Sequence, residues 1–263
     1  MNIAAQPSML IPEFDLTGKV AVITGGNRSI GRGSAEALAE AGAAVVIAGR
    51  NEADLEQVRS RIAERGGTAL AVRCDVSQAA DVDNLFARAA AEFGHVDTCL
   101  VNAGVFGKWQ SAELMELSEW DTIYDIDLRG AMLTAMAAGK QMIAQGTGGT
   151  IVTIASIQGV VGIKGTVAYT AAKHGVVGMT KGLALDWAEH GIRVNCIAPA
   201  FIERDVEPLQ KDPVAVEFVT TRTPLQRWGT PRELGLCVLF LASPASSYVT
   251  GAVLNVDGGW CAQ

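Results

Sequence analysis

The sequence KVAVITGGNRSIG, residues 19–31, decides the fold of this chain. Residues 19–24 are mainly apolar and β-branched, which is typical of a strand buried on both faces. A glycine-rich turn follows at once, and the apolar periodicity of residues 30–41 predicts a helix after it. A buried strand joined to a helix by such a turn opens a βαβ unit, and βαβ units build parallel sheets.

The same alternation continues to the end of the chain. Further strands are expected at residues 44–48, 68–74, 98–102, 150–155, 193–197 and 253–256. Helices are expected at residues 51–65 with Asn51 as N-cap, at 77–93, from Ser118 towards Met142, at 167–189 and at 231–241. Ser118 and Asp121 resemble a capping box at the start of the third of these helices. The sequence therefore predicts an α/β fold with a doubly wound, Rossmann-like parallel sheet.

Composition narrows the classes of partner. The chain has 263 residues, of which 49% are hydrophobic and 19% charged, and this predicts one domain at residues 15–263 after an extension at residues 1–14. The net charge of −7 and the lack of a basic run argue against nucleic acid, and no apolar run is long enough to cross a membrane. The five cysteines are scattered without a CxxC pair, which favours a reducing, cytoplasmic location. Neither they nor the histidines show metal-ligand spacing, so no metal site is expected.

The turn at residues 24–31, TGGNRSIG, is the first candidate binding site. Small residues there let the backbone approach a pyrophosphate, and the start of the following helix offers free N–H groups and partial positive charge. A tight turn without a ligand is the alternative, because glycine-rich strand–helix turns are common. Ser29 is expected to be strained if its position needs a positive φ.

The end of the second strand indicates which dinucleotide would bind. A carboxylate at this point is typical of NAD-binding proteins, because it binds the ribose 2′-hydroxyl. Here Gly49 occupies that place and Arg50 follows it, and Arg28 in the glycine-rich turn can join Arg50 at a 2′-phosphate. NADP(H) is therefore favoured and NAD(H) stays possible. Two solvated surface arginines are the alternative interpretation.

The second candidate site consists of Ser156, Tyr169 and Lys173. Tyr169 and Lys173 are four residues apart on an expected helix and so share one face. Ser156 lies just past the carboxyl end of an expected strand, where ligands bind in doubly wound sheets. A free tyrosine has a pKa of about 10, and the positive charges of Lys173 and of an oxidised nicotinamide are expected to lower it. Tyr169 can then act as a general acid or base near neutrality.

These motifs resemble the short-chain dehydrogenase/reductase family over residues 14–260, with the best match to its gluconate and deoxygluconate dehydrogenase-like branch. The glycine-rich turn, Cys74-Asp75-Val76, Asn102-Ala103-Gly104 and Ser156 with YxxxK at residues 169–173 carry the resemblance. The resemblance implies a homotetramer, a substrate hydrogen bond from Ser156 and a nicotinamide-ribose contact from Lys173. The cofactor-binding residues predicted from it and from the two arginines are Gly25, Asn27, Arg28, Ser29, Ile30, Gly31, Arg50, Asp75, Val76, Asn102, Ala103, Gly104, Tyr169, Lys173, Pro199 and Ile202.

Two departures from the family pattern bear on the chemistry. Asp127 replaces an asparagine that the resemblance places in a catalytic proton relay, and an ionised Asp127 would favour the ammonium of Lys173 and oppose the phenolate. Arg204 replaces a threonine in a predicted substrate lid at about residues 200–228. Arg204, Arg222 and Arg227 could favour an anionic substrate, although solvated lid charges are the favoured interpretation. Trp109 and Trp120 could contact the substrate, although packing is the favoured interpretation for both.

The sequence thus predicts a dinucleotide-binding oxidoreductase that transfers a hydride between NAD(P)(H) and a small-molecule carbonyl/secondary alcohol substrate. Ser156, Tyr169, Lys173 and Asp127 are its predicted catalytic residues, with Tyr169 as general acid/base. A non-catalytic nucleotide-binding or regulatory protein on the same scaffold is the alternative. A dehydratase or epimerase is less favoured, because the chain lacks an added substrate domain.

Overall fold

The computed structural model describes residues 11–205 and 209–262. Within them, seven strands form a single all-parallel sheet in the order β3-β2-β1-β4-β5-β6-β7. The strands are β1 (Val20–Thr24), β2 (Ala44–Gly49), β3 (Thr68–Arg73), β4 (Thr98–Val101), β5 (Gly149–Ile154), β6 (Ile192–Pro199) and β7 (Val253–Val256). The strand order reverses between β1 and β4, which makes this the switch point where doubly wound sheets bind ligands. The predicted fold class is confirmed.

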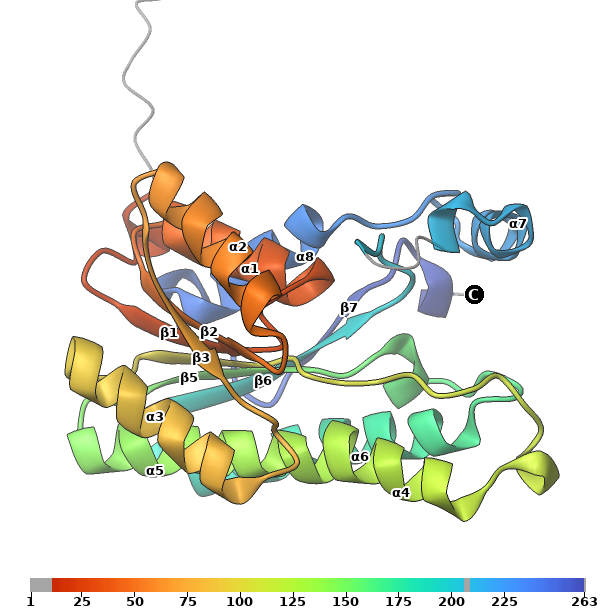
Figure 1. Ribbon diagram of the computed structural model, residues 1–263, viewed down its shortest axis with the longest axis horizontal. Coiled ribbons are helices and arrows are strands. Elements are labelled where there is room, and N and C mark those ends of the chain that lie inside the picture. The colour runs from red at the N-terminus through yellow and green to blue at the C-terminus, as the bar shows by residue number, and fades with distance from the viewer. Residues whose placement is uncertain (1–10, 206–208, 263) are drawn as a thin grey trace, which may run out of the picture.

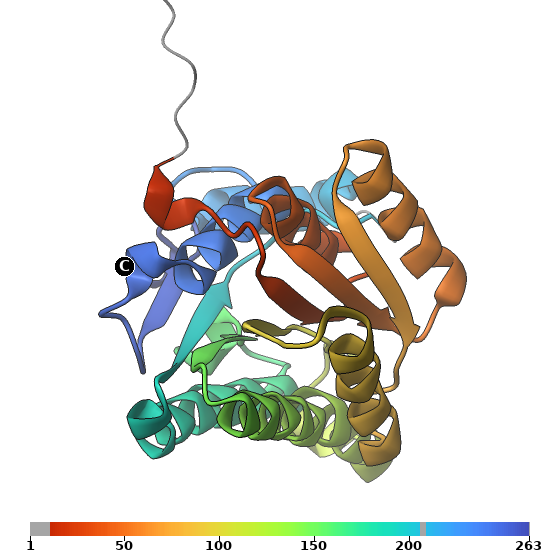
Figure 2. The same ribbon diagram turned by 90° about the vertical axis from the view of Figure 1, so that its left-hand side faces the viewer.

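Helices cover both faces of the sheet (Figures 1 and 2). One face carries α1 (Ser29–Glu40), α2 (Glu52–Glu64) and α8 (Pro231–Ala242). The other carries α3 (Ala79–Phe93), α4 (Leu117–Tyr124), α5 (Ala131–Gln145) and α6 (Val167–Asp186). The remaining helix, α7 (Pro213–Arg222), lies in the segment that follows the carboxyl end of β6.

Each face of the sheet buries its own apolar cluster. Successive strand residues point to opposite faces, so Val22 belongs to the cluster beneath α3, α5 and α6, whereas Ile23 belongs to the one beneath α1, α2 and α8. Leu38 of α1 and Leu85 of α3 are fully buried against these opposite faces. This is why the strands read as continuous apolar runs in the sequence.

α1 and α8 approach each other so closely that only glycine fits between them. A Cβ atom added to Gly33 would lie 2.4 Å from the backbone oxygen of Pro231, and one added to Gly235 would lie 2.4 Å from that of Gly33. The two helices therefore meet backbone to backbone. This contact fixes α1, which begins at the glycine-rich turn, against α8, which begins just after the predicted lid.

The predicted capping box at Ser118 and Asp121 is wrong. α4 begins at Leu117, its N-cap residue Glu116 makes no side-chain cap, and the Ser118 carbonyl accepts a hydrogen bond from the Thr122 hydroxyl within the helix. The helix also does not run evenly towards Met142. A π-helical turn at Asp125–Gly130 separates α4 from α5.

Other helix limits differ from the expectation by a few residues. The helix expected from Ser77 begins at Ala79, and the one expected to reach residue 189 ends at Asp186 before a short 3-10 helix. The N-cap role of Asn51 is confirmed, because its side-chain oxygen accepts hydrogen bonds from the N–H groups of Ala53 and Asp54.

Two predicted segments lie partly outside the described residues. Of the expected extension at residues 1–14, only residues 11–14 are described, and Pro12–Phe14 form a 3-10 helix. Of the expected lid at residues 200–228, residues 206–208 fall outside the description, and the rest contains α7 and the short 3-10 helix Leu209–Lys211. In the described ranges, none of the helices has the length and apolar character needed to span a membrane.

Candidate active site

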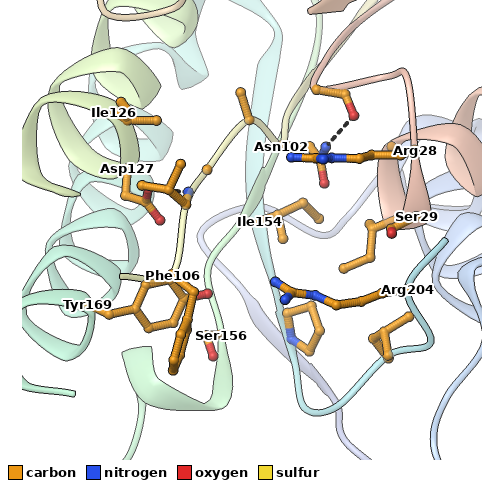
Figure 3. Close-up of a pocket in the computed structure, with 18 of the residues that line it drawn as sticks. Arg28, Ser29, Asn102, Phe106, Ile126, Asp127, Ile154, Ser156, Tyr169 and Arg204 are labelled. Carbon is orange, nitrogen blue, oxygen red and sulfur yellow. Dashed lines mark hydrogen bonds between the residues drawn. The ribbon is translucent and has the colours of Figure 1, made fainter. Parts of the chain in front are cut away.

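A cavity of about 710 Å³ opens at the carboxyl ends of the strands around the switch point. This volume is ordinary for a ligand-binding pocket. All predicted catalytic and cofactor-binding residues line it: Gly25, Asn27, Arg28, Ser29, Ile30, Gly31, Arg50, Asp75, Val76, Asn102, Ala103, Gly104, Asp127, Ser156, Tyr169, Lys173, Pro199 and Ile202. Figure 3 shows Asp127, Tyr169, Phe106 and Ser156 on one side of the cavity and Arg28, Ser29 and Arg204 on the other.

The glycine-rich turn is folded tightly against its neighbours. Gly25 has a φ of 64°, and a Cβ atom on Gly31 would lie 2.0 Å from the Gly25 oxygen, so neither position accepts a side chain without a shift. Ser29 has a φ of 44°, the left-handed value at which the sequence predicted strain. The Ser29 N–H at the start of α1 donates to the Asp205 carboxylate at 2.7 Å, and the residues that follow, Ile30 and Gly31, line the cavity, where their N–H groups fit a dinucleotide pyrophosphate.

Asn102 ties the end of β4 to the glycine-rich turn. Its side-chain nitrogen donates to the backbone oxygens of Thr24 and Gly25 at 3.0 and 3.1 Å, and its backbone N–H donates to the Thr24 hydroxyl at 3.1 Å. The side-chain amide is thus used to hold two strand ends together. Ala103 and Gly104 continue along the cavity wall.

Arg50 directly follows β2 and Arg28 directly precedes α1, and both line the cavity. Burial works against the charged form of the nearby Asp75, but hydrogen bonds from Ser77 and the positive charges of Arg50 and Arg73 outweigh it and lower the pKa of Asp75. The sequence missed Asp54, which also lines this end of the cavity and accepts a hydrogen bond of 3.3 Å from the Asn27 side chain.

Tyr169, Lys173 and Ser156 converge as the sequence predicted. Tyr169 and Lys173 lie in the first half of α6, and the Lys173 ammonium nitrogen is 5.4 Å from the centre of the Tyr169 ring. The same nitrogen donates a hydrogen bond of 3.2 Å to the backbone oxygen of Ile154, the last residue of β5. Ser156 follows two residues later and lies beside Tyr169 on the same side of the cavity (Figure 3).

Asp127 forms a buried ion pair with Lys173. Its Oδ2 atom lies 3.1 Å from the Lys173 ammonium nitrogen, and the side chains are 0% and 5% exposed. The backbone N–H of Val105 donates to the other carboxylate oxygen at 2.7 Å. Asp127 belongs to the π-helical turn, a local widening of the helix that is frequent at functional sites and here places the carboxylate inside.

Burial leaves Tyr169 less acidic than expected. Burial raises the pKa of Tyr169 most strongly and Asp127 raises it further, whereas Lys173, Ser156 and Arg204 lower it, with a net rise. For Lys173, burial is the largest influence and lowers the pKa, but the negative charge and hydrogen bond of Asp127, together with Tyr169 and Cys196, raise it overall. As the sequence predicted, Lys173 lowers the pKa of Tyr169 and Asp127 raises it.

Aromatic side chains that the sequence reading missed form the wall beside Tyr169. The Phe106 ring lies 4.9 Å from the Tyr169 ring and 5.9 Å from that of Trp109, between ring centres. For Trp109 the sequence favoured packing over substrate contact, but the side chain lines the cavity and is 51% exposed. Phe201 and Trp228 complete the wall from the lid side. Phe106 follows the predicted cofactor-binding residue Gly104 by two residues, and this spacing could have indicated that Phe106 lies at the cavity.

Comparisons with known proteins agree with the geometry. Residues 25–261 match the sequence model described as enoyl-(acyl carrier protein) reductase. The 2-dehydro-3-deoxy-D-gluconate 5-dehydrogenase of Escherichia coli (strain K12) is 37% identical over 256 residues, covering 97% of this chain and 100% of that protein.

Solved structures of dehydrogenases are also similar to this chain in sequence and in fold. A short-chain type dehydrogenase/reductase from Mycobacterium marinum is 40% identical with a TM-score of 0.91, covering 95% of this chain and 98% of that one. A gluconate 5-dehydrogenase from Burkholderia cenocepacia, solved with NADP and tartrate, is 36% identical with a TM-score of 0.89 and the same coverage. These relatives are named as enzymes, so the non-catalytic alternative finds no support. The chain belongs to the short-chain dehydrogenase/reductase family, and it is an NAD(P)-dependent oxidoreductase.

Proposed function

We propose that this protein interconverts a secondary alcohol and a carbonyl compound, with NADP(H) as its preferred cofactor and Tyr169 as general acid/base. The observation that carries the proposal is the convergence of Ser156, Tyr169 and Lys173 on one side of the dinucleotide-sized cavity. A phenol, a hydroxyl and an ammonium group at one point match the needs of a reaction that builds and discharges negative charge on oxygen.

Each residue has a distinct task in the proposed reaction. In reduction, the substrate carbon gains a hydride and its oxygen gains the Tyr169 proton, so the carbonyl becomes an alcohol, and oxidation reverses both transfers. The Ser156 hydroxyl donates a hydrogen bond to the substrate oxygen and so stabilises its developing charge. Lys173 stabilises the Tyr169 phenolate, and Asp127 sets how much of the Lys173 charge is available for this. When bound, the nicotinamide supplies or accepts the hydride and, in its oxidised form, adds positive charge.

The cofactor-binding residues divide along the cavity. The N–H groups at the start of α1 would hold the pyrophosphate. Arg50 and Arg28 would pair with a 2′-phosphate, which is the basis for preferring NADP(H). Asp75 and Val76 would lie beside the adenine. Residues 102–104, together with Pro199 and Ile202, would line the nicotinamide half, and Lys173 would contact its ribose. The gluconate 5-dehydrogenase solved with NADP supports this assignment.

Replacing Tyr169 by phenylalanine tests the proposal. The ring keeps its contact with Phe106 but loses the transferable proton, so we expect turnover to fall by about 10²–10⁴-fold while the Kd for NADP(H) stays unchanged. Thr170→Ser, one residue away on the same helix, serves as the matched control. Full turnover by Tyr169→Phe would refute the assignment.

We also propose that the protein is a cytoplasmic homotetramer. Large apolar side chains stand exposed on several elements, including Leu117 of α4, Leu185 of α6 and Tyr248 before β7, and burial between subunits would remove them from water. All five cysteines are free thiols, as a reducing compartment favours. Light scattering of the purified protein measures the assembly, and a monomeric mass would contradict it.

A further inference from the structure

The three arginines of the lid have different surroundings. The Arg227 guanidinium lies 2.6 Å from a carboxylate oxygen of Glu233, and the Arg222 guanidinium lies 4.2 Å from the centre of the Phe218 ring. Arg204 instead lines the main cavity, and Figure 3 shows its side chain extending from the lid towards the side where Ser156 and Tyr169 lie. In residues 11–205 and 209–262, no carboxylate forms an ion pair with Arg204.

The backbone that carries Arg204 is fixed on both sides. Before it, the Glu203 N–H donates to the Gly229 oxygen at 2.9 Å. After it, the Asp205 carboxylate accepts hydrogen bonds from the Ser29 N–H at 2.7 Å and from the Arg32 side chain at 2.9 Å. The Gln210 side chain also donates to the Arg204 oxygen at 2.9 Å. The backbone at Arg204 is thus held in place, so this segment loses little further freedom when a ligand binds.

The other cations of the cavity are placed for other tasks. Arg28 and Arg50 are assigned to the 2′-phosphate in the cofactor site proposed above, and the Lys173 charge is balanced by Asp127 at 3.1 Å. Glu203 also lines the cavity, but its negative charge acts on the pKa of Arg227. At the end of the cavity where Tyr169 lies, Arg204 is therefore the described cation that no described carboxylate pairs with.

We propose that Arg204 binds a carboxylate group of the substrate, so that the alcohol or ketone turned over is a hydroxy acid or keto acid. The inference rests on the hydride transfer proposed above, whose substrate it specifies. One planar guanidinium matches one carboxylate through two parallel hydrogen bonds, and its single positive charge balances the single negative charge of a carboxylate, whereas a phosphate monoester carries nearly two negative charges. The carboxylate holds the molecule at the lid while its reacting oxygen lies between Ser156 and Tyr169. Arg204 is thus a specificity-determining residue.

The test compares matched acid and neutral compounds on the full-length protein loaded with NADP⁺. D-gluconate is paired with D-glucitol and L-tartrate with L-threitol, so that the members of a pair differ in carboxylate against hydroxymethyl groups. Calorimetric titration gives the Kd, and steady-state assays give KM and kcat separately. The variants are Arg204→Gln and Arg204→Lys, with Arg227→Gln as a lid arginine that lies outside the main cavity.

We expect the wild-type protein to prefer the acid of at least one pair by about 10-fold or more. Arg204→Gln should weaken binding of that acid by about 10–100-fold, leave the Kd for NADP⁺ and for neutral compounds unchanged, and be partly rescued by Arg204→Lys. Arg227→Gln should keep the wild-type preference. Equal loss for both members of a pair, loss of NADP⁺ binding alone, or no binding of either acid would overturn the assignment.

The two proposals fail in different ways. Binding of an acid through Arg204 without turnover would contradict the hydride transfer and leave the carboxylate site intact. Turnover of an acid and of its neutral partner with KM and kcat values that Arg204→Gln leaves unchanged would contradict the carboxylate site and leave the hydride transfer intact.

Discussion

The carboxylate of Asp127 lies 3.1 Å from the ammonium nitrogen of Lys173, and both side chains are buried. Lys173 therefore serves two negative groups, this carboxylate and the phenolate that Tyr169 forms during the reaction. The Asp127 carboxylate and the Tyr169 phenolate both interact with the Lys173 ammonium group. The pKa of Tyr169 is therefore expected to respond to the charge at position 127. The pH dependence of turnover therefore measures the effect of Asp127 on the pKa of Tyr169 most directly.

Replacing Asp127 by asparagine should shift the pH profile to lower pH. Asp127 raises the pKa of Tyr169, so removing its negative charge lowers that pKa. Oxidation needs the Tyr169 phenolate, so the rising limb of its pH–rate profile moves to lower pH. Reduction needs the phenol, so the falling limb of its profile also moves to lower pH. The measurement is kcat/KM against pH. Asp125→Asn is the control, an exposed carboxylate in the same π-helical turn. Coincident wild-type and Asp127→Asn profiles would rule out the electrostatic role.

Replacing Ser29 by glycine should stabilise the protein by about 1 kcal/mol, because glycine adopts its φ of 44° without strain. It should also tighten dinucleotide binding, since a side chain is removed from the phosphate cradle. Gln226→Gly is the control, at the other non-glycine residue of positive φ, 53°, in the described chain. Both variants should resist denaturant better, but only Ser29→Gly should lower the Kd for NADP⁺. A Kd unchanged in Ser29→Gly would show that the side chain does not crowd the cofactor.

Replacing Arg50 by alanine should weaken NADP⁺ binding by about 10–100-fold and leave NAD⁺ binding nearly unchanged, because only NADP⁺ carries the 2′-phosphate. Arg73→Ala is the control, since Arg73 also lies near Asp75 but pairs with Asp81 at 3.5 Å. Fluorescence titration with each dinucleotide gives the two Kd values. Equal effects on both dinucleotides would locate Arg50 elsewhere than at the 2′-phosphate.

Replacing Gly235 by alanine should destabilise the protein by about 1–3 kcal/mol, because its new Cβ atom would lie 2.4 Å from the Gly33 backbone oxygen and force α1 and α8 apart. Gly162→Ala adds a methyl group that meets no atom within 4 Å and should change stability little. The free energy of unfolding in denaturant is the measurement. Equal stability of the two variants would mean that α1 and α8 can move apart without lowering the free energy of unfolding.

Much of this fold could be predicted from local patterns. The strands are apolar runs because they are buried on both faces, and this signal is visible without knowing their partners. The convergence of Tyr169 and Lys173 follows from helix periodicity, and the place of Ser156 follows from the end of β5. Each of these inferences needs only a few neighbouring residues.

The remainder depends on contacts between distant segments. The π-helical turn that brings Asp127 to Lys173 has no local signature, since the same residues could continue an ordinary α-helix. The net direction of the Tyr169 pKa depends on its burial, which the chain around it does not reveal. The three lid arginines look alike in sequence, and only the fold separates Arg204 at the cavity from Arg227 at Glu233.

The bonds from Asp205 to Ser29 and Arg32 join the segment that would grip the substrate to the helix that would grip the pyrophosphate. A pyrophosphate bound at the start of this helix would compete with the Asp205 carboxylate, so the two ligands are expected to influence each other. Such coupling is reciprocal: the dinucleotide should change the Kd of the hydroxy acid or keto acid by the same factor as the acid changes the Kd of the dinucleotide. Titrating each ligand with and without the other measures this factor, and a factor of one would show that the two sites are independent.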